Sequence, residues 1–136
     1  MLSPTWITVR LFLHVLGAAI WVGGQIVLAG LVPGLRRISA DAPRFAARRF
    51  NVLAWSAFAL LFVTGVWNLL EIDLADRSTD YLVTLGLKLT AVALTGVGAF
   101  LHGISRTRTG LAVWGSVAGT FGLVALFLGE LLGTGA

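Results

Sequence analysis

The chain has no cysteine, and its only methionine is Met1. A chain without cysteine forms no disulfide, no thiolate metal site and no CxxCH attachment for a c-type haem. Cu(I) prefers thiolate and thioether ligands, so this composition makes the chain a poor conduit for soft metal ions.

Charged residues are also scarce. They make up 12% of the 136 residues, whereas 57% are hydrophobic and the mean hydropathy is +0.92. This balance is too apolar for a soluble domain and indicates a polytopic α-helical membrane protein. The apolar runs are about twice the ten-residue length of a barrel strand and do not alternate, which excludes a β-barrel. No phosphate-binding loop, nucleophile elbow or HExxH motif appears, and nucleic-acid binding has no support beyond a net charge of +4.

Four apolar stretches are each long enough to cross a bilayer, because about 20 residues of helix span its hydrocarbon core. We expect transmembrane helices at about residues 5–32, 50–70, 81–104 and 110–132. Short connections predict a single domain, residues 1–136, folded as an all-α up-down-up-down four-helix bundle. Ser3 is expected to cap the first helix, and Pro33-Gly34 to end it.

Arginine is concentrated in two of the three connections. Residues 33–49 hold Arg36, Arg37, Arg44, Arg48 and Arg49, and residues 105–109 hold Arg106 and Arg108. The middle connection is acidic and has a single arginine. By the positive-inside rule, both basic loops lie in the cytoplasm and both termini lie outside, in a bacterial-type inner membrane. These arginines are best explained as topology signals that contact lipid headgroups.

The first predicted helix carries polar groups that hydrocarbon does not solvate. At helical spacing, Arg10, His14, Trp21 and Gln25 share one face, and Gly17 lies in the turn between them. A polar stripe on a spanning helix must face other helices, water or a cofactor. Gln25 lies deeper than the others and is expected to form an interhelical hydrogen bond. The candidate site is therefore the outer half of the stripe.

Lys88 is the most unusual residue of the third predicted helix. A lysine at mid-span costs about 2.5–3.5 kcal/mol on insertion scales. His14 lies about 12 Å, and Lys88 about 10 Å, from the outer ends of their helices. We therefore expect the two side chains at the same level, meeting across a pocket. The alternative is a lysine that snorkels outward or packs against Glu71 or Glu130.

Other polar groups gather at the same outer level. Thr64 and Asn68 are expected there on the second helix, and Glu130 on the fourth is a candidate partner for an intramembrane cation. His102 lies about 21 Å deeper than Lys88, near the cytoplasmic edge. It is either an interfacial histidine or a second haem or metal ligand.

The surroundings of His14 suit a b-type haem. Imidazole serves haem iron, copper, zinc and proton transfer. His14 would be the axial ligand and Arg10 a partner for a propionate. Gly17 and Gly24 would leave room for the macrocycle. Haem ranks above copper because soft ligands are missing. A His14 that only hydrogen-bonds a neighbouring helix is the alternative.

Two segments resemble a known family. LHVLGAAIWVGG, residues 13–24, resembles the first helix of the copper-resistance D (CopD) domain, with its histidine, a tryptophan seven residues on, and Gly-Gly. LGLKLTAVALTGVGAFLH, residues 85–102, resembles a later helix of that domain, with a lysine near its start. The HemJ-type protoporphyrinogen oxidases look related, and there this histidine and lysine are implicated in haem b binding and activity. The resemblance implies a cofactor site at His14, Lys88 and Trp21, with Lys88 as the candidate catalytic residue.

The residues and the resemblance together favour a membrane protein that binds a b-type haem or porphyrin, for electron transfer or porphyrin oxidation. Whether it is an enzyme stays open, and a haem-dependent membrane oxidoreductase is the class in question. Two other functions stay open: a component for copper or small-cation transport, and a non-catalytic structural subunit of a larger membrane complex. CopD proteins usually have eight spans, so a four-span chain is either a minimal stand-alone version or a subunit that forms a homodimer or joins a larger membrane complex. The redox partner is not identifiable from the sequence.

Overall fold

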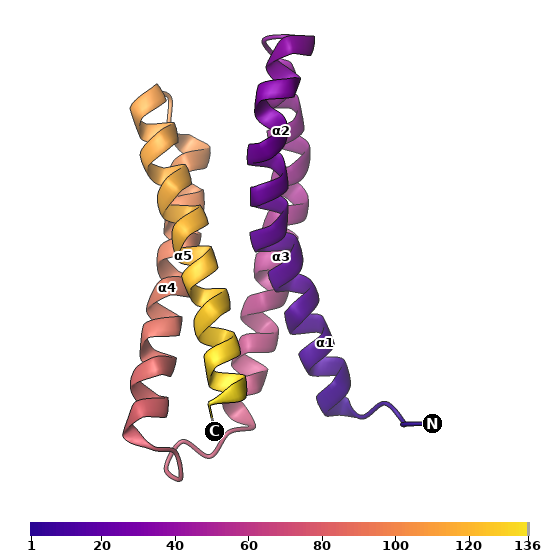
Figure 1. The fold of residues 1–136 in the computed structure, drawn as a ribbon, viewed down its shortest axis with the longest axis vertical. Helices are drawn as coiled ribbons and strands as arrows, with labels where there is room; N and C mark the ends of the chain where they lie inside the picture. Colours follow the sequence, from indigo (N-terminus) through magenta and orange to yellow (C-terminus); the bar gives the residue numbers. More distant parts are fainter. Residues whose placement is uncertain (136) are drawn as a thin grey trace. The chain divides into compact units, whose positions relative to one another are not determined.

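The computed structural model describes residues 1–135, and within them it is helical with no strand (Figure 1). Its elements are α1 (Trp6–Ala18), η1 (Ala19–Gly23), α2 (Gly24–Ile38), α3 (Ala42–Leu70), α4 (Thr79–Ile104) and α5 (Arg108–Thr134). Because the first three are continuous, these elements make four helices long and apolar enough to cross a membrane. The predicted all-α fold is confirmed: the chain is a multi-pass membrane protein with apolar helices suited to the lipid bilayer.

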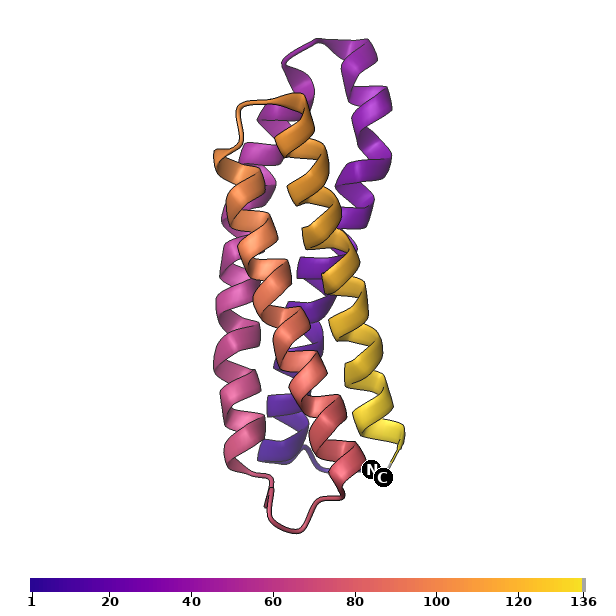
Figure 2. The ribbon, with the colours of Figure 1, turned by 90° about the vertical axis from the view of Figure 1, so that its left-hand side faces the viewer.

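The chain divides into two compact units, Met1–Ile72 and Asp73–Ala136. In the first unit, α1, η1 and α2 pack against α3, and in the second unit α4 packs against α5. Figures 1 and 2 show that the helices of each unit run antiparallel. Each unit is therefore a helical hairpin closed by a short turn.

The first helix begins at a reciprocal pair of threonines. The Thr5 hydroxyl accepts the backbone N–H of Thr8, and the Thr8 hydroxyl accepts that of Thr5, both at 3.3 Å. The predicted cap at Ser3 is wrong because this pair satisfies two N–H groups of the first turn at once.

The predicted end of the first helix at Pro33 is also wrong. Helix α2 continues to Ile38 with Pro33 inside it. Proline removes one intrahelical hydrogen bond, and membrane helices tolerate this loss where the freed carbonyl finds another partner. Arg36 and Arg37 in the last turn favour the extension, because cations are stabilised at a helix C-terminus.

Helix α3 is longer than the predicted span 50–70. Its 29 residues correspond to about 43 Å of rise, compared with about 30 Å of hydrocarbon. The excess is at the N-terminal end, which holds Arg44, Arg48 and Arg49. The predicted span is therefore the apolar remainder of a helix that begins at Ala42.

A π-helical turn, η1, interrupts the first helix around Trp21. Such turns are rare and occur frequently at functional sites. The side-chain amide of Gln25 donates to the Trp21 carbonyl oxygen at 3.0 Å. The predicted interhelical hydrogen bond of Gln25 is therefore wrong, because the amide reaches a carbonyl one turn away on its own helix.

Small residues bring α4 and α5 close together. The hydroxyl of Thr95 donates to the Ala118 carbonyl oxygen at 2.6 Å, and both residues are buried. A methyl group at Gly98 would come within 2.8 Å of the Ala118 backbone nitrogen. Close backbone approach of this kind is typical of helix interfaces in membranes.

Candidate functional site

The polar stripe of the first helix faces α3. Along this interface the pairs are Arg10 with Glu71, His14 with Thr64, Gly17 with Ala57 and Leu61, Trp21 with Trp55 and Phe58, and Gly24 with Phe50. These five positions of the first helix are spaced alternately by four and three residues, which is the spacing of a helix–helix seam. Of the predicted common face, Arg10, His14 and Trp21 lie at the interface of the first hairpin.

A chain of hydrogen bonds orients the imidazole of His14. Its Nδ1 lies 2.8 Å from Thr64 Oγ1, and that oxygen lies 2.7 Å from the Leu60 carbonyl oxygen. A carbonyl only accepts, so the single hydroxyl hydrogen of Thr64 goes to Leu60, and Thr64 accepts the Nδ1–H of His14. In the neutral ring the lone pair therefore lies on Nε2. Metal-ligating histidines are commonly oriented in this way.

The His14–Thr64 bond is protected from water. Thr64 is 2% exposed and His14 is half-buried. Gly65 lies beside the ring, where a methyl group would make an ordinary contact of 3.7 Å with His14 Cε1. Inside a low-dielectric interior such a bond is stronger than in water, so it holds the ring in one orientation.

Arg10 lies at the end of the same interface that is nearer the N-terminus. Its Nη1 is 3.6 Å from Glu71 Oε2, and its guanidinium carbon is 6.0 Å from the centroid of Trp67. The Arg10 side chain is 12% exposed, and within residues 1–135 its Nε has no hydrogen-bond partner. Oδ1 of Asn68 is also buried without a partner in that range. Each such group costs about 1–3 kcal/mol, so these are the atoms that a polar ligand would satisfy.

Trp21, predicted to line the cofactor site, lies in an aromatic cluster with α3. Its ring centroid is 5.5 Å from that of Trp55 and 4.6 Å from that of Phe58, in edge-to-face and tilted arrangements. Aromatic pairs favour these geometries. Trp21 is 2% exposed, so the first hairpin uses its ring for packing. A contact between Trp21 and a cofactor stays a prediction.

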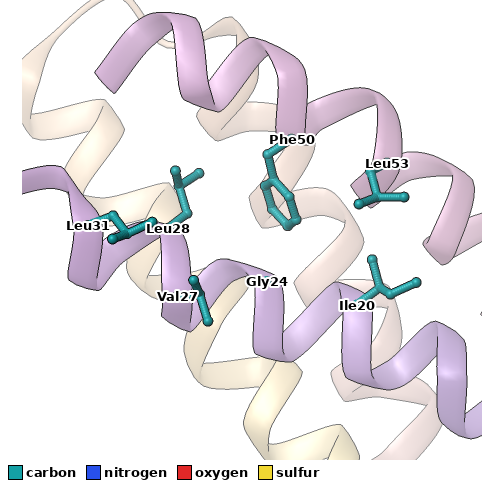
Figure 3. A pocket seen from close by; sticks show the side chains of 7 residues that line it. All are labelled: Ile20, Gly24, Val27, Leu28, Leu31, Phe50 and Leu53. Atoms are coloured by element: carbon teal, nitrogen blue, oxygen red, sulfur yellow. The ribbon is translucent and has the colours of Figure 1, made fainter. Parts of the chain in front are cut away.

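The two glycines expected to make room for a macrocycle are covered by α3. A methyl group at Gly17 would come 3.0 Å from Leu61 Cγ and 3.1 Å from the Ala57 carbonyl oxygen. At Gly24 it would overlap the ring of Phe50, which Figure 3 shows beside that position. That prediction is wrong at Gly17, which allows α1 and α3 to approach closely.

The side chains of His14 and Arg10 therefore suit a haem chemically, but the packing of the first hairpin limits where a haem could lie. An oriented imidazole at His14 and a cation with an unsatisfied donor at Arg10 suit an iron ligand and a propionate partner. Beside Gly17, the seam between α1 and α3 has no room for a macrocycle. A haem on His14 would have to lie outside that seam.

Lys88 lies in the second hairpin, where α5 makes room for it. A methyl group at Gly129 would come 3.3 Å from Lys88 Nζ and 3.5 Å from its Cε. The end of the lysine side chain therefore lies beside α5 at a position that has no side chain. The carboxylate of Glu130 attracts the ammonium group electrostatically. Intramembrane lysines usually have such a partner. The predicted meeting of Lys88 with His14 involves two hairpins and stays a prediction.

His102 connects the two helices of the second hairpin near their turn. Its Nδ1 donates to the Leu111 carbonyl oxygen at 2.8 Å, and a methyl group at Gly115 would come 3.0 Å from that nitrogen. These contacts hold the ring of His102 against α5. Across the part of the chain that the structure describes, no group of three or more His, Cys, Asp or Glu could hold a metal ion. A role of His102 as a haem or metal ligand stays a prediction.

No family model, curated protein or solved structure matches this chain. The resemblance to CopD and HemJ proteins therefore depends on the segments around His14 and Lys88 alone. The contacts of Arg10 with Trp67 and Glu71 were not predicted from the sequence. The available signal was that Trp67 and Glu71 follow Thr64 by three and seven residues, which places Thr64 and Trp67 on one face of α3 and Glu71 in line with them at its C-cap.

Proposed function

We propose that this protein binds a b-type haem or porphyrin in the outer half of the membrane, for electron transfer or porphyrin oxidation. The observation that carries the proposal is the hydrogen-bond chain from His14 through Thr64 to the Leu60 carbonyl. It presents an imidazole with its proton on Nδ1 and its lone pair on Nε2. A bound haem would supply one-electron chemistry that the side chains themselves lack.

The residues around His14 have separate roles in this proposal. Thr64 orients the ring, and His14 is the axial ligand. Arg10 holds an anionic group through its unsatisfied Nε, while Glu71 keeps the guanidinium at the outer surface. Lys88 is the second ligand or a proton-handling group, with Glu130 balancing its charge.

Haem is better supported than copper or another transported cation. The described residues offer one oriented imidazole and no cluster of three metal-binding side chains, and the chain has no cysteine. One axial histidine is sufficient to hold a haem iron, whereas Cu(I) favours several soft ligands.

The membrane setting is part of the proposal. We place the protein in a bacterial-type inner membrane with both termini outside and both arginine-rich loops in the cytoplasm. A haem outside the seam of the first hairpin needs a second apolar wall. The other hairpin, a second copy of the chain or a larger membrane complex would provide it.

An optical spectrum of the detergent-purified protein from haem-replete cells tests the proposal. We expect a Soret band, and its loss or shift in His14→Ala. Gln25→Ala is the matched control, because Gln25 belongs to the same stripe but its amide bonds to the Trp21 carbonyl of its own helix. A colourless protein that takes up no added haem would refute the proposal, as would a wild-type spectrum in His14→Ala.

A further inference from the structure

The first hairpin has an apolar groove near the turn that joins α2 to α3. Its volume is about 360 Å³, and Figure 3 shows its lining from η1 and α2, between Ile20 and Leu31, and from Phe50 and Leu53 of α3. All the lining side chains are apolar. The groove is distinct from the His14 site, which lies on the α1 part of the helix.

The groove is open along its length. Val27 is 60% exposed, Leu31 is 54% exposed and Leu53 is 53% exposed, although all three line it. At its centre Gly24 contributes no side chain, and the ring of Phe50 covers the backbone there. An open apolar groove on a membrane-spanning hairpin matches an extended hydrocarbon chain in chemistry.

Five arginines, called here the arginine rim, lie close in sequence to the end of the groove at Leu31 and Phe50. Arg36, Arg37, Arg44, Arg48 and Arg49 each lie within six residues of one of these two positions, or about 9 Å of helix rise. All five are exposed. Between residues 33 and 49 the only acidic residue is Asp41, and within residues 1–135 none of the five forms an ion pair.

We propose that the groove and this arginine rim form a binding site for an anionic phospholipid. One acyl chain occupies the groove, and the phosphate binds the guanidinium groups. Arginine binds phosphate oxygens in bidentate fashion, and basic clusters at the cytoplasmic end of spanning helices recognise anionic headgroups. The site is independent of the proposed haem site.

Charge decides between a lipid and a second copy of the chain as occupant. A two-fold dimer through this groove would bring the same surface of both copies together. The arginine rims would then face each other, and like charges repel. A lipid phosphate neutralises the same rim, so the lipid is the occupant that the charge favours.

Native mass spectrometry of the full-length protein tests the headgroup. The purified protein is titrated with phosphatidylglycerol and with phosphatidylcholine of the same acyl chains. We expect a preference for phosphatidylglycerol. Each arginine near the membrane contributes about fivefold, so Arg37→Gln with Arg49→Gln should lower the preference about 25-fold. The matched control, Arg106→Gln with Arg108→Gln, removes the same charge from the other basic loop and should keep the preference.

A second pair of variants tests the groove. Val27→Trp fills it, whereas Ile26→Trp adds the same ring at a neighbouring exposed position outside the lining. Val27→Trp should abolish retention of phosphatidylglycerol, and Ile26→Trp should keep it. The proposal is overturned if the wild type binds both lipids equally or if the loop control loses the preference equally. It is also overturned if Val27→Trp changes the oligomeric mass and leaves lipid retention unaltered.

Discussion

At the scale of single residues, Thr64 determines which ring nitrogen of His14 carries the proton and which carries the lone pair. Because Thr64 gives its hydrogen to the Leu60 carbonyl, it acts only as an acceptor toward His14. The sequence predicted both residues at one level of the membrane. It could not predict their bond, because side-chain contact depends on the close approach of α1 and α3 at Gly17, which lacks a side chain.

Thr64→Val should lower the affinity for haem and leave the stability of the folded protein nearly unchanged. Valine keeps the shape of threonine and removes the acceptor that orients His14. Loss of such an orienting partner lowers metal affinity about 10–100-fold, so haem affinity in a titration should fall by that factor. An interhelical hydrogen bond in a membrane contributes about 0.6 kcal/mol on average, so unfolding in detergent should change little.

Thr64→Ser is the control, because it retains the hydroxyl and should retain the affinity. If Thr64→Val binds haem as tightly as the wild type, the bond only joins the two helices and the orienting role is refuted.

At the scale of elements, the existence of each helix was predictable, as were the ends at Leu70 and Ile104, whereas the start and end of the first helix were not. Apolar length alone determines whether a segment crosses a membrane, and all four spans follow from it. The ends depend on single hydrogen bonds, such as the Thr5–Thr8 pair, and on the tolerance of one helix for Pro33. The π-helical turn had no sequence signal, although it coincides with the aromatic packing of Trp21 on α3.

Gly98→Ala should weaken the second hairpin. The added methyl group meets the backbone of Ala118 at 2.8 Å, and backbone cannot move aside as a flexible side chain can. Overpacking of this kind costs about 1–3 kcal/mol. Denaturant unfolding of the purified protein should show a loss of this size.

Gly86→Ala is the matched control, since it changes the same residue type in α4 with no atom within 4 Å of the new methyl group. It should be neutral or stabilising by up to about 1 kcal/mol, because alanine favours a helix over glycine. Equal destabilisation by both variants would contradict the assignment of Gly98 to a close helix contact.

At the scale of the whole molecule, each hairpin provides an acidic partner for its own cation. Arg10 meets Glu71 in the first hairpin, and Glu130 attracts Lys88 in the second. The sequence left these pairings open, because both hairpins have acidic residues close to an end of a helix. The interaction of His14 with Lys88 would connect the hairpins, and the haem proposal depends on it only for the second ligand.

The proposed orientation can be tested because the chain has no cysteine of its own. Ala40 and Ala75 lie in the first and second connections, and both are exposed. The positive-inside rule places Ala40 in the cytoplasm and Ala75 outside. In intact cells a membrane-impermeant maleimide should label Ala75→Cys and leave Ala40→Cys unlabelled, and permeabilised cells should label both. Labelling of Ala40→Cys in intact cells would show that the protein has the opposite orientation in the membrane. It would place the His14 site in the cytoplasmic half of the membrane and the arginine rim at the outer surface.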